Sequence, residues 1–190
     1  MSLIKLQGNP SGTGAFTIAA PNGNTDRTLT LPDNTGTILT SASTSVLPKG
    51  GPAFRAVIGS QSIASATITK LTLSSETFDT NSRFNATGST VDGIPAYAFL
   101  PNVAGYYLVT FNLQYVGPGF SGLVASKLYK NGSQYEEMAV FPGTFQYVRG
   151  TGAASVYLNG SNDYLEFYAF QVNGTQPVAA DCSASLVRAD

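Results

Sequence analysis

The sequence predicts an all-β protein, an antiparallel jelly-roll sandwich of about ten strands that follows an extended β-rich N-terminal arm. Apolar side chains recur at every second position in many short segments, and Gly, Pro and Asn separate these segments. No segment shows a convincing helical period. Many short strands without helices are typical of a sandwich or a jelly roll.

Residues 1–40 are expected to form the arm. Residues 8–40 are nearly free of charge and rich in Thr, Gly and Asn, with short β pieces at 15–19, 28–31 and 37–39. Such pieces bury too little apolar surface to be stable alone. We therefore expect the arm to become ordered only against a partner, either its own trimer mates or a larger assembly.

Residues 41–52 have the Ser-, Gly- and Pro-containing composition of a linker. Residues 53–190 then carry the strand signals of the jelly-roll domain. Before the central strand of this domain, strands or strand pairs are predicted at residues 54–58, 63–73, 77–85 and 96–100. The last predicted strand covers residues 182–188.

The most strongly predicted strand covers residues 106–116. The large side chains that alternate along it and share one face are Tyr107, Val109, Phe111, Leu113 and Tyr115. Thr110, Asn112 and Gln114 are expected on the opposite face. Pro101 and Gly105 are expected to form the corner that leads into the strand, because proline donates no ladder hydrogen bond and glycine permits a sharp turn.

Two Asn-Gly pairs, Asn131-Gly132 and Asn159-Gly160, follow the central strand. Both residue types tolerate the positive φ angles of a type I′ turn, so each pair predicts a β-hairpin. The second predicted hairpin has a looser loop of about five residues.

The composition excludes several classes of protein. Ten basic and eleven acidic residues give a formal net charge of −1, so no broad basic face for nucleic acid or an anionic membrane is expected. No apolar run is long enough for a signal peptide or a membrane span, and we expect synthesis in a host cytoplasm without a secretory signal. Charged residues form only 11% of the chain, which favours a surface partly hidden in an oligomer.

Catalytic chemistry is not expected. Without His and with a single Cys, the chain has no Ser-His or Cys-His nucleophile pair and no zinc site of the usual ligand type. Glu136 and Glu137 are adjacent on one strand and therefore point to opposite faces. Asp163 and Glu166 are expected to solvate a loop and a strand edge. We therefore predict a non-enzymatic protein.

Three residues offer hard oxygen ligands in loops. Asp79, Asn81 and Asp92 are weak candidates for a calcium site. Asp and Asn are also common turn formers, and the spacing of these three residues matches no known calcium loop. No cofactor is therefore expected.

Several motifs between residues 53 and 190 share their order and spacing with a known family. They are Phe78-Asp79, Phe84-Asn85, the set Phe99, Pro101, Gly105 and Tyr107, the Lys127-Leu-Tyr-Lys-Asn-Gly hairpin, and Val156-Tyr-Leu followed by Asp163-Tyr-Leu-Glu-Phe. They resemble the globular head of complement component one-q and its tumour-necrosis-factor-like relatives. The terminal Cys182-Ser-Ala-Ser-Leu-Val departs from the Phe-Ser-Gly-Phe-Leu that the family often has. The resemblance implies a jelly roll of roughly ten strands that assembles as a threefold trimer.

The arm carries two further motifs, Gly12-Thr-Gly-Ala-Phe-Thr-Ile-Ala-Ala-Pro-Asn and Arg27-Thr-Leu-Thr-Leu-Pro-Asp-Asn-Thr-Gly-Thr-Ile-Leu. Together they resemble a segment near the start of tail-fibre and other virion proteins of bacteriophages. This resemblance implies that the arm attaches to other virion proteins of the capsid or tail. The residues expected to make this attachment are Phe16, Ile18, Arg27, Leu29, Leu31, Ile38 and Leu39.

Aromatic residues gather after the second Asn-Gly pair, with Tyr164, Tyr168 and Phe170 on one face and Leu165 and Phe167 on the other. A strand that is apolar on both faces needs cover on both sides. We expect the sandwich core to cover one face and a trimer axis to cover the other. The predicted trimer interface consists of Tyr107, Tyr164, Tyr168 and Phe170.

A sugar-binding shelf is the functional alternative for these aromatic residues. Tyrosine rings stack on sugars and also supply a hydroxyl group. Such a shelf is first expected on the loops at residues 117–122 and 141–150, and the sequence does not choose between them.

These interpretations combine into a non-enzymatic, homotrimeric phage structural protein at the virion surface. Its arm anchors it to the particle, and its head acts as a short tail fibre or receptor-binding protein with a host surface glycan as candidate ligand. The first alternative is a capsid decoration, or cement, protein that stabilises the head. The second alternative is a secreted complement-like recognition module, which calls for a signal peptide or collagen-like Gly-x-y repeats, and the sequence shows neither.

Overall fold

The computed structural model describes residues 10–14, 17, 22–23, 28, 51–115, 120–145 and 148–189. The chain divides into two units, Met1–Thr40 and Ser41–Asp190, and all the described strands belong to the second. The expected limits of the arm, linker and domain stay predictions. Over the ranges just given the structure contains no helix, and therefore none long and apolar enough to cross a membrane.

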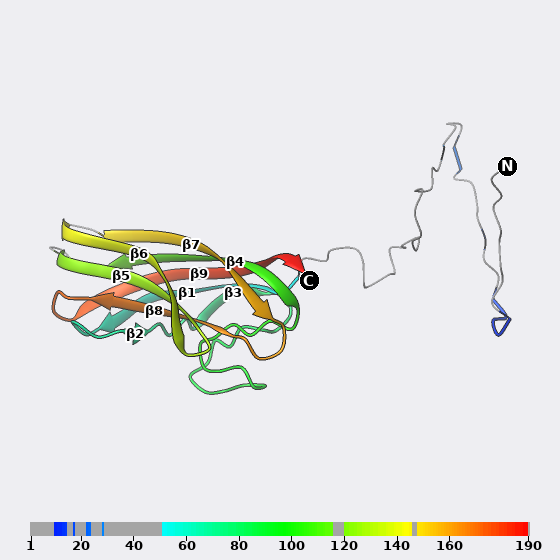
Figure 1. Cartoon of the computed structure of the whole chain (residues 1–190), viewed down its shortest axis with the longest axis horizontal. Helices are drawn as coiled ribbons and strands as arrows, with labels where there is room; N and C mark the ends of the chain where they lie inside the picture. Colours follow the sequence, from blue (N-terminus) through cyan, green and yellow to red (C-terminus); the bar gives the residue numbers. More distant parts are fainter. Residues whose placement is uncertain are drawn as a thin grey trace. The chain divides into compact units, whose positions relative to one another are not determined.

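Two antiparallel sheets form the layers of a sandwich (Figure 1). The described strands are β1 (Ala53–Ile63), β2 (Thr69–Lys70), β3 (Ser75–Asp79), β4 (Ala104–Tyr115), β5 (Phe120–Lys130), β6 (Ser133–Phe145), β7 (Val148–Asn159), β8 (Leu165–Gln171) and β9 (Gln176–Ala189). The five-stranded sheet has the order β3-β1-β9-β4-β7, and the four-stranded sheet has the order β2-β8-β5-β6. The described domain is thus an all-β antiparallel jelly roll, which confirms the predicted fold class.

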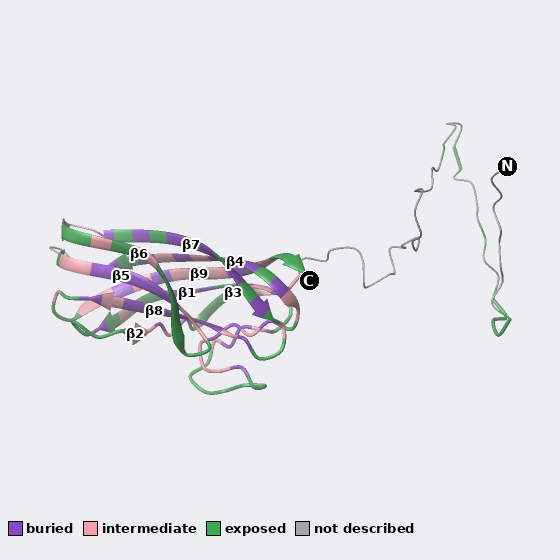
Figure 2. Ribbon diagram, in the orientation of Figure 1, coloured by how far each residue is buried: buried purple, intermediate pink, exposed green. Residues whose placement is uncertain are grey.

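Strands β4 and β7 show why this sequence forms a sheet. Burial and exposure alternate residue by residue along all of β7, and Figure 2 shows this as alternating purple and green. In β4 the predicted inward residues are all buried: Tyr107, Val109, Phe111, Leu113 and Tyr115. Because successive side chains of a strand point to opposite faces, the two-residue apolar period places these five large side chains of β4 in the core.

The two Asn-Gly pairs have different structures. Asn131 and Gly132 have φ angles of 54° and 75° and join β5 directly to β6, so the first predicted hairpin is confirmed. The second prediction is wrong, because β7 pairs with β4 whereas β8 pairs with β5 and β2. The loop after Asn159 therefore carries the chain from the five-stranded to the four-stranded sheet.

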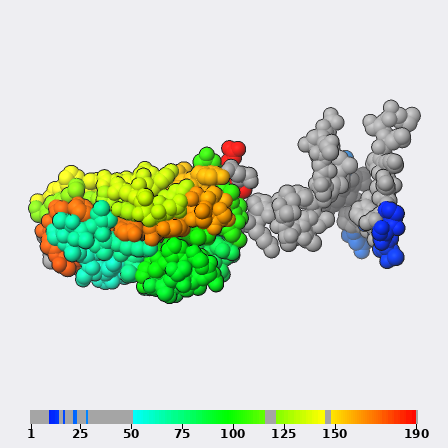
Figure 3. Space-filling view, turned by 60° about the horizontal axis from the view of Figure 1, so that its bottom comes forward, coloured from blue at the N-terminus to red at the C-terminus, as the bar shows by residue number. Residues whose placement is uncertain are grey.

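The long segment between β3 and β4, residues 80–103, forms a lobe beside the sandwich, in green in Figure 3. Buried Asn85 organises it, because its side-chain amide donates to the carbonyl oxygens of Ser89, Ile94 and Pro95. The strands expected at residues 84–85 and 96–100 are reduced to isolated bridges, in which Phe99 pairs with Phe84 and Leu165.

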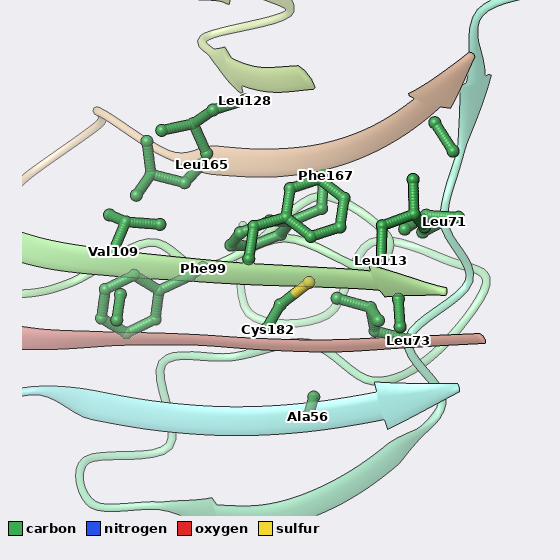
Figure 4. Packing of buried hydrophobic residues seen from close by; sticks show 14 of the residues in the cluster. Ala56, Leu71, Leu73, Phe99, Val109, Leu113, Leu128, Leu165, Phe167 and Cys182 are labelled. Atoms are coloured by element: carbon green, nitrogen blue, oxygen red, sulfur yellow. The ribbon is translucent and has the colours of Figure 1, made fainter. Parts of the chain in front are cut away.

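The core fills the space between the sheets. Figure 4 shows Leu165 and Phe167 of β8 pointing toward β4, where Val109 and Leu113 lie, and toward Cys182 of β9. Phe54 stacks on Phe84 with ring centroids 4.3 Å apart and lies 4.8 Å from Phe99. These rings also attach the lobe to the core, since residues 84 and 99 both belong to it. The other large members of the cluster are Ile63, Leu71, Leu73, Tyr107, Phe111, Tyr115, Leu128, Val156 and Leu158.

Candidate interaction surfaces

The outer face of the five-stranded sheet carries an apolar patch. Tyr106 and Leu108 of β4 and Tyr157 of β7 are 47%, 41% and 37% exposed. Tyr106 lies directly opposite Tyr157 in the strand register, and their rings meet edge to face with centroids 5.4 Å apart. Large apolar side chains that gather on one exposed face mark a candidate interaction site. We call these three residues the apolar patch.

Next to the apolar patch, this face carries paired polar and charged side chains. Thr110 of β4 bonds to Ser183 of β9 at 2.7 Å, so these two polar side chains satisfy each other. Arg55 of β1 and Asp181 of β9 form an ion pair at 2.7 Å, and this pair raises the pKa of Arg55. A face whose polar groups are already paired loses little when a second surface covers it.

A polar hollow of about 110 Å³ lies at the other end of the same face. Its polar lining comes from Asn112 and Gln114 of β4, Arg149 of β7 and Asp181 of β9. The five-stranded sheet thus has an apolar end and a polar end, and both lie on its outward side.

The outer face of the four-stranded sheet has a different character. Two ion pairs lie across it, Lys70 with Glu166 and Lys127 with Glu137. Tyr129 of β5 stacks on Tyr168 of β8 with ring centroids 4.0 Å apart. Burial, and then the charge of Glu166, raise the pKa of Tyr168 to about 12. This face is therefore polar and aromatic rather than apolar.

The predicted trimer residues do not share one surface. Tyr107 is completely buried between the sheets, and its hydroxyl donates to the carbonyl oxygen of Val103 at 2.7 Å. Its assignment to an interface is corrected by this position, because no second chain can reach a side chain in the core of the first. Tyr164, Tyr168 and Phe170 are half-buried at or next to the outer face of β8.

Sequence analysis predicted none of the three members of the apolar patch as interface residues. Tyr106 and Leu108 are separated by an even number of positions from the polar residues of β4, which point outward. Since every second side chain of a strand shares a face, both residues lie on the outward face with Thr110, Asn112 and Gln114. Two large apolar groups at the start of an otherwise polar face were the available signal. The longer apolar period of the inward face of β4 obscured this signal.

Asp163 and Glu166 are buried, at 9% and 5% exposed, rather than solvating a loop and an edge. Burial raises the pKa of Asp163, but hydrogen bonds from Lys130, Asn131 and the backbone N–H of Asn159 outweigh it and leave the pKa lowered. The sequence expectation fails because the loop from β7 to β8 crosses between the sheets. The carboxylate of Asp163 thereby becomes the acceptor that ties this crossing to the β5–β6 turn.

The calcium candidates fall into two groups. Asp79 and Asp92 line one hollow of about 300 Å³ with Glu76, whereas Asn81 does not line it. The oxygens of Asp79 accept the backbone N–H groups of Asn81 and Phe84, as expected of a turn former. Within the described ranges no three acidic, His or Cys side chains are grouped so that they could hold a metal ion.

The loops expected to carry a sugar-binding shelf meet at one end of the sandwich. Tyr115 is paired with Val148 and Phe120 with Phe145, so the connections β4–β5 and β6–β7 lie side by side. Residues 116–119 and 146–147 at the tips of these loops lie outside the described residues. The seven predicted attachment residues of the arm, Phe16, Ile18, Arg27, Leu29, Leu31, Ile38 and Leu39, also lie outside them.

Comparisons with known proteins agree with this architecture. No protein-family model and no curated protein sequence matches the chain. Among solved structures, the globular domain of zebrafish complement 1qA protein is similar with a TM-score of 0.55 at 15% identity, over 73% of this chain and 99% of that one. The PRD1 vertex protein P5 is similar with a TM-score of 0.53 at 18% identity, over 73% of this chain and 99% of that one. At such identities the similarity shows the jelly-roll fold that these proteins share.

Proposed function

We propose that this jelly-roll chain is a non-enzymatic structural protein of a phage virion that self-associates as a trimer through the outer face of its five-stranded sheet. The observation that carries the proposal is the apolar patch of Tyr106, Leu108 and Tyr157 on that face. The arm attaches the trimer to the particle, and the head is displayed at the virion surface as a short tail fibre or receptor-binding protein.

Self-association through this face has a physical basis. A stable interface buries about 800 Å² on each partner and has a core depleted of charge. The outward residues of β4 carry no charge, and those of β7 carry only Arg149. The three-fold number comes from the resemblance to trimeric complement-like heads. In a three-fold ring the contacts are heterologous, so the apolar patch of each subunit packs against a different surface of its neighbour.

The virion role rests on two supports. The arm motifs resemble phage tail-fibre segments, and the fold is similar to that of a vertex protein, PRD1 P5. The second support also favours a capsid role, so a decoration protein is kept as the second candidate. In either role the protein binds its own copies and other virion proteins, and in the receptor-binding role it also binds a host surface glycan.

The oligomeric state is tested by sedimentation of the full chain and of residues 53–190 between about 1 and 50 µM, a range in which a trimer with a dissociation constant in the micromolar range or below is detected. The proposal expects a mass three times that of the 19.8 kDa chain, and a corresponding trimer of the truncated chain. A truncated chain that stays monomeric would show that the jelly roll does not trimerise by itself. A monomeric full chain would overturn self-association altogether.

The location is tested by immunogold electron microscopy of virions with antibody against residues 53–190. Gold at the tail identifies a fibre, whereas gold spread over the whole head identifies a decoration protein. Particles without any label contradict the virion role.

A further inference from the structure

The outer face of the four-stranded sheet gathers three tyrosines around one buried carboxylate. Tyr164 and Tyr168 lie two residues before and two residues after Glu166, so all three side chains share one face. Tyr129 of β5 is the direct register partner of Glu166. Figure 3 shows β8 in orange beside the yellow-green of β5 and β6 on this side of the molecule. We call these four residues the tyrosine face.

The tyrosines present flat rings with neutral hydroxyls. The rings of Tyr129 and Tyr168 are in contact and tilted, with an interplanar angle of 30°. Burial, and then the charge of Glu166, raise the pKa of both Tyr164 and Tyr168, that of Tyr168 to about 12. Both hydroxyls therefore stay protonated at neutral pH and can donate hydrogen bonds.

Glu166 has an unused acceptor. Its side chain is 7% exposed, and its Oε1 accepts a hydrogen bond from Lys70. In the described part of the chain no group donates to Oε2, which is buried. A buried acceptor without a donor is unfavourable. A ligand hydroxyl would supply the missing donor.

The charges of the face select the class of ligand. Lys70 is paired with Glu166, and Lys127 with Glu137, so the pairs leave no net charge. A phosphate or another anion would need unpaired cations, and a polyamine would need unpaired carboxylates. Flat rings next to donors and acceptors without net charge instead suit a neutral polyhydroxylated molecule, which packs its C–H face on a ring and its hydroxyl rim on polar groups.

We propose that the tyrosine face binds a neutral oligosaccharide. This inference rests on the proposed function, in which the five-stranded sheet is covered by neighbouring copies and the four-stranded sheet stays open to the host. The sugar ring packs on Tyr129 and Tyr168, and Glu166 accepts one of its hydroxyls. The ligand surface is thus the face of a sheet rather than the loops at the end of the sandwich.

The test titrates the full chain, by calorimetry, with neutral hexasaccharides of glucose, galactose, mannose and N-acetylglucosamine, and with a sialic acid hexamer as the anionic probe. We expect at least one neutral probe to bind and the anionic probe not to bind. Tyr129→Ala and Tyr168→Ala should each weaken binding at least tenfold, because stacking area is lost. Glu166→Gln should weaken it about fivefold while keeping the size of the side chain.

The matched control is Phe78→Ala, which removes an aromatic side chain that is 44% exposed on β3 of the other sheet. It should bind like the unmodified chain. Tyr168→Phe, which keeps the ring, guards against loss of folding and should retain most of the affinity. The inference is overturned if no neutral probe binds, if only the anionic probe binds, or if the alanine variants bind normally.

Sedimentation of the same samples separates the two proposals. A trimer that binds no neutral sugar leaves self-association standing and overturns only the sugar site. A monomer that binds a neutral sugar through Tyr129 and Tyr168 overturns self-association and supports the tyrosine face.

Discussion

The two sheets are alike on their inner faces and different on their outer faces. Both contribute large apolar groups to one core, as β4 does with Phe111 and β8 with Phe167. Outside, the five-stranded sheet presents Tyr106, Leu108 and Tyr157, whereas the four-stranded sheet presents ion pairs and stacked tyrosines. The inner faces are therefore equivalent as parts of the fold, and only the outer faces distinguish the proposed assembly surface from the proposed ligand surface.

The ion pairs of the two faces show the same difference. Arg55 and Asp181 on the five-stranded sheet have side chains 48% and 29% exposed, whereas Lys70 and Glu166 have side chains 25% and 7% exposed. Water screens the first pair and is largely excluded from the second. The charged groups of the four-stranded sheet are thus part of its packing.

The largest expected effect comes from Leu108→Glu in the apolar patch. A charge placed at the centre of the proposed interface should raise the dissociation constant of the trimer at least 100-fold, about 3 kcal/mol, while the exposed position leaves the fold intact. Sedimentation measures the dissociation, and circular dichroism checks the fold.

The control for this change is Ile68→Glu. Ile68 is exposed to a similar degree, at 44%, but lies outside the five-stranded sheet. Its variant should remain trimeric. A Leu108→Glu variant that stays trimeric would remove the distinction between the two outer faces.

The next effect concerns the place where the edges of the two sheets meet. A Cβ atom on Gly152 of β7 would lie 2.3 Å from the carbonyl oxygen of Met138 on β6. Gly152→Ala should therefore destabilise the domain by about 2 kcal/mol through overpacking, measured by urea unfolding. Gly59→Ala, where a Cβ would meet nothing within 4 Å, is the control and should be nearly neutral. Equal stability of the two variants would show that β6 and β7 can move apart to accommodate the added methyl group without a measurable cost in stability.

Asp163, which ties the crossing between the sheets, gives a smaller and pH-dependent effect. Its pKa is lowered in the folded protein, so it contributes stability above its unfolded value near 4, and this contribution is lost as pH falls through the folded value. Asp163→Asn should cost about 1.5 kcal/mol at pH 7, and this cost should shrink as the pH falls through the folded value. Urea unfolding at a series of pH values measures both. A difference that does not change with pH would mean that the carboxylate is not ionised at the crossing.

The smallest effect is expected for Arg55→Ala on the five-stranded sheet. The Arg55 side chain is 48% exposed, so loss of its pair with Asp181 should leave the urea midpoint unchanged in the monomeric Leu108→Glu background. Lys70→Ala on the other sheet should lower the midpoint, because it leaves buried Glu166 without its hydrogen-bond donor. Equal shifts of the urea midpoint in the two variants would show that the ion pairs of the two faces contribute equally to stability.

Local patterns in the sequence were sufficient for the central strand and for the first turn. The two-residue period of β4 placed Tyr107 and Phe111 on one side, and Asn131-Gly132 predicted the β5–β6 turn, because both signals depend only on neighbouring residues. The low charge of the chain favours a surface hidden in an oligomer, without showing which surface, and this stays a prediction.

Only the tertiary structure decided what each strand pairs with. Asn159-Gly160 has the same local signal as the first turn, yet its loop crosses between sheets, because pairing depends on residues far apart in the sequence. The packing of the two sheets also buried Asp163 and Glu166. It also placed Tyr107 in the core and left Tyr106, the next residue in the chain, on the outer face. Alternation along a strand predicts that the strand has two different faces, and only the packing of one sheet on the other determines which face is exposed to solvent.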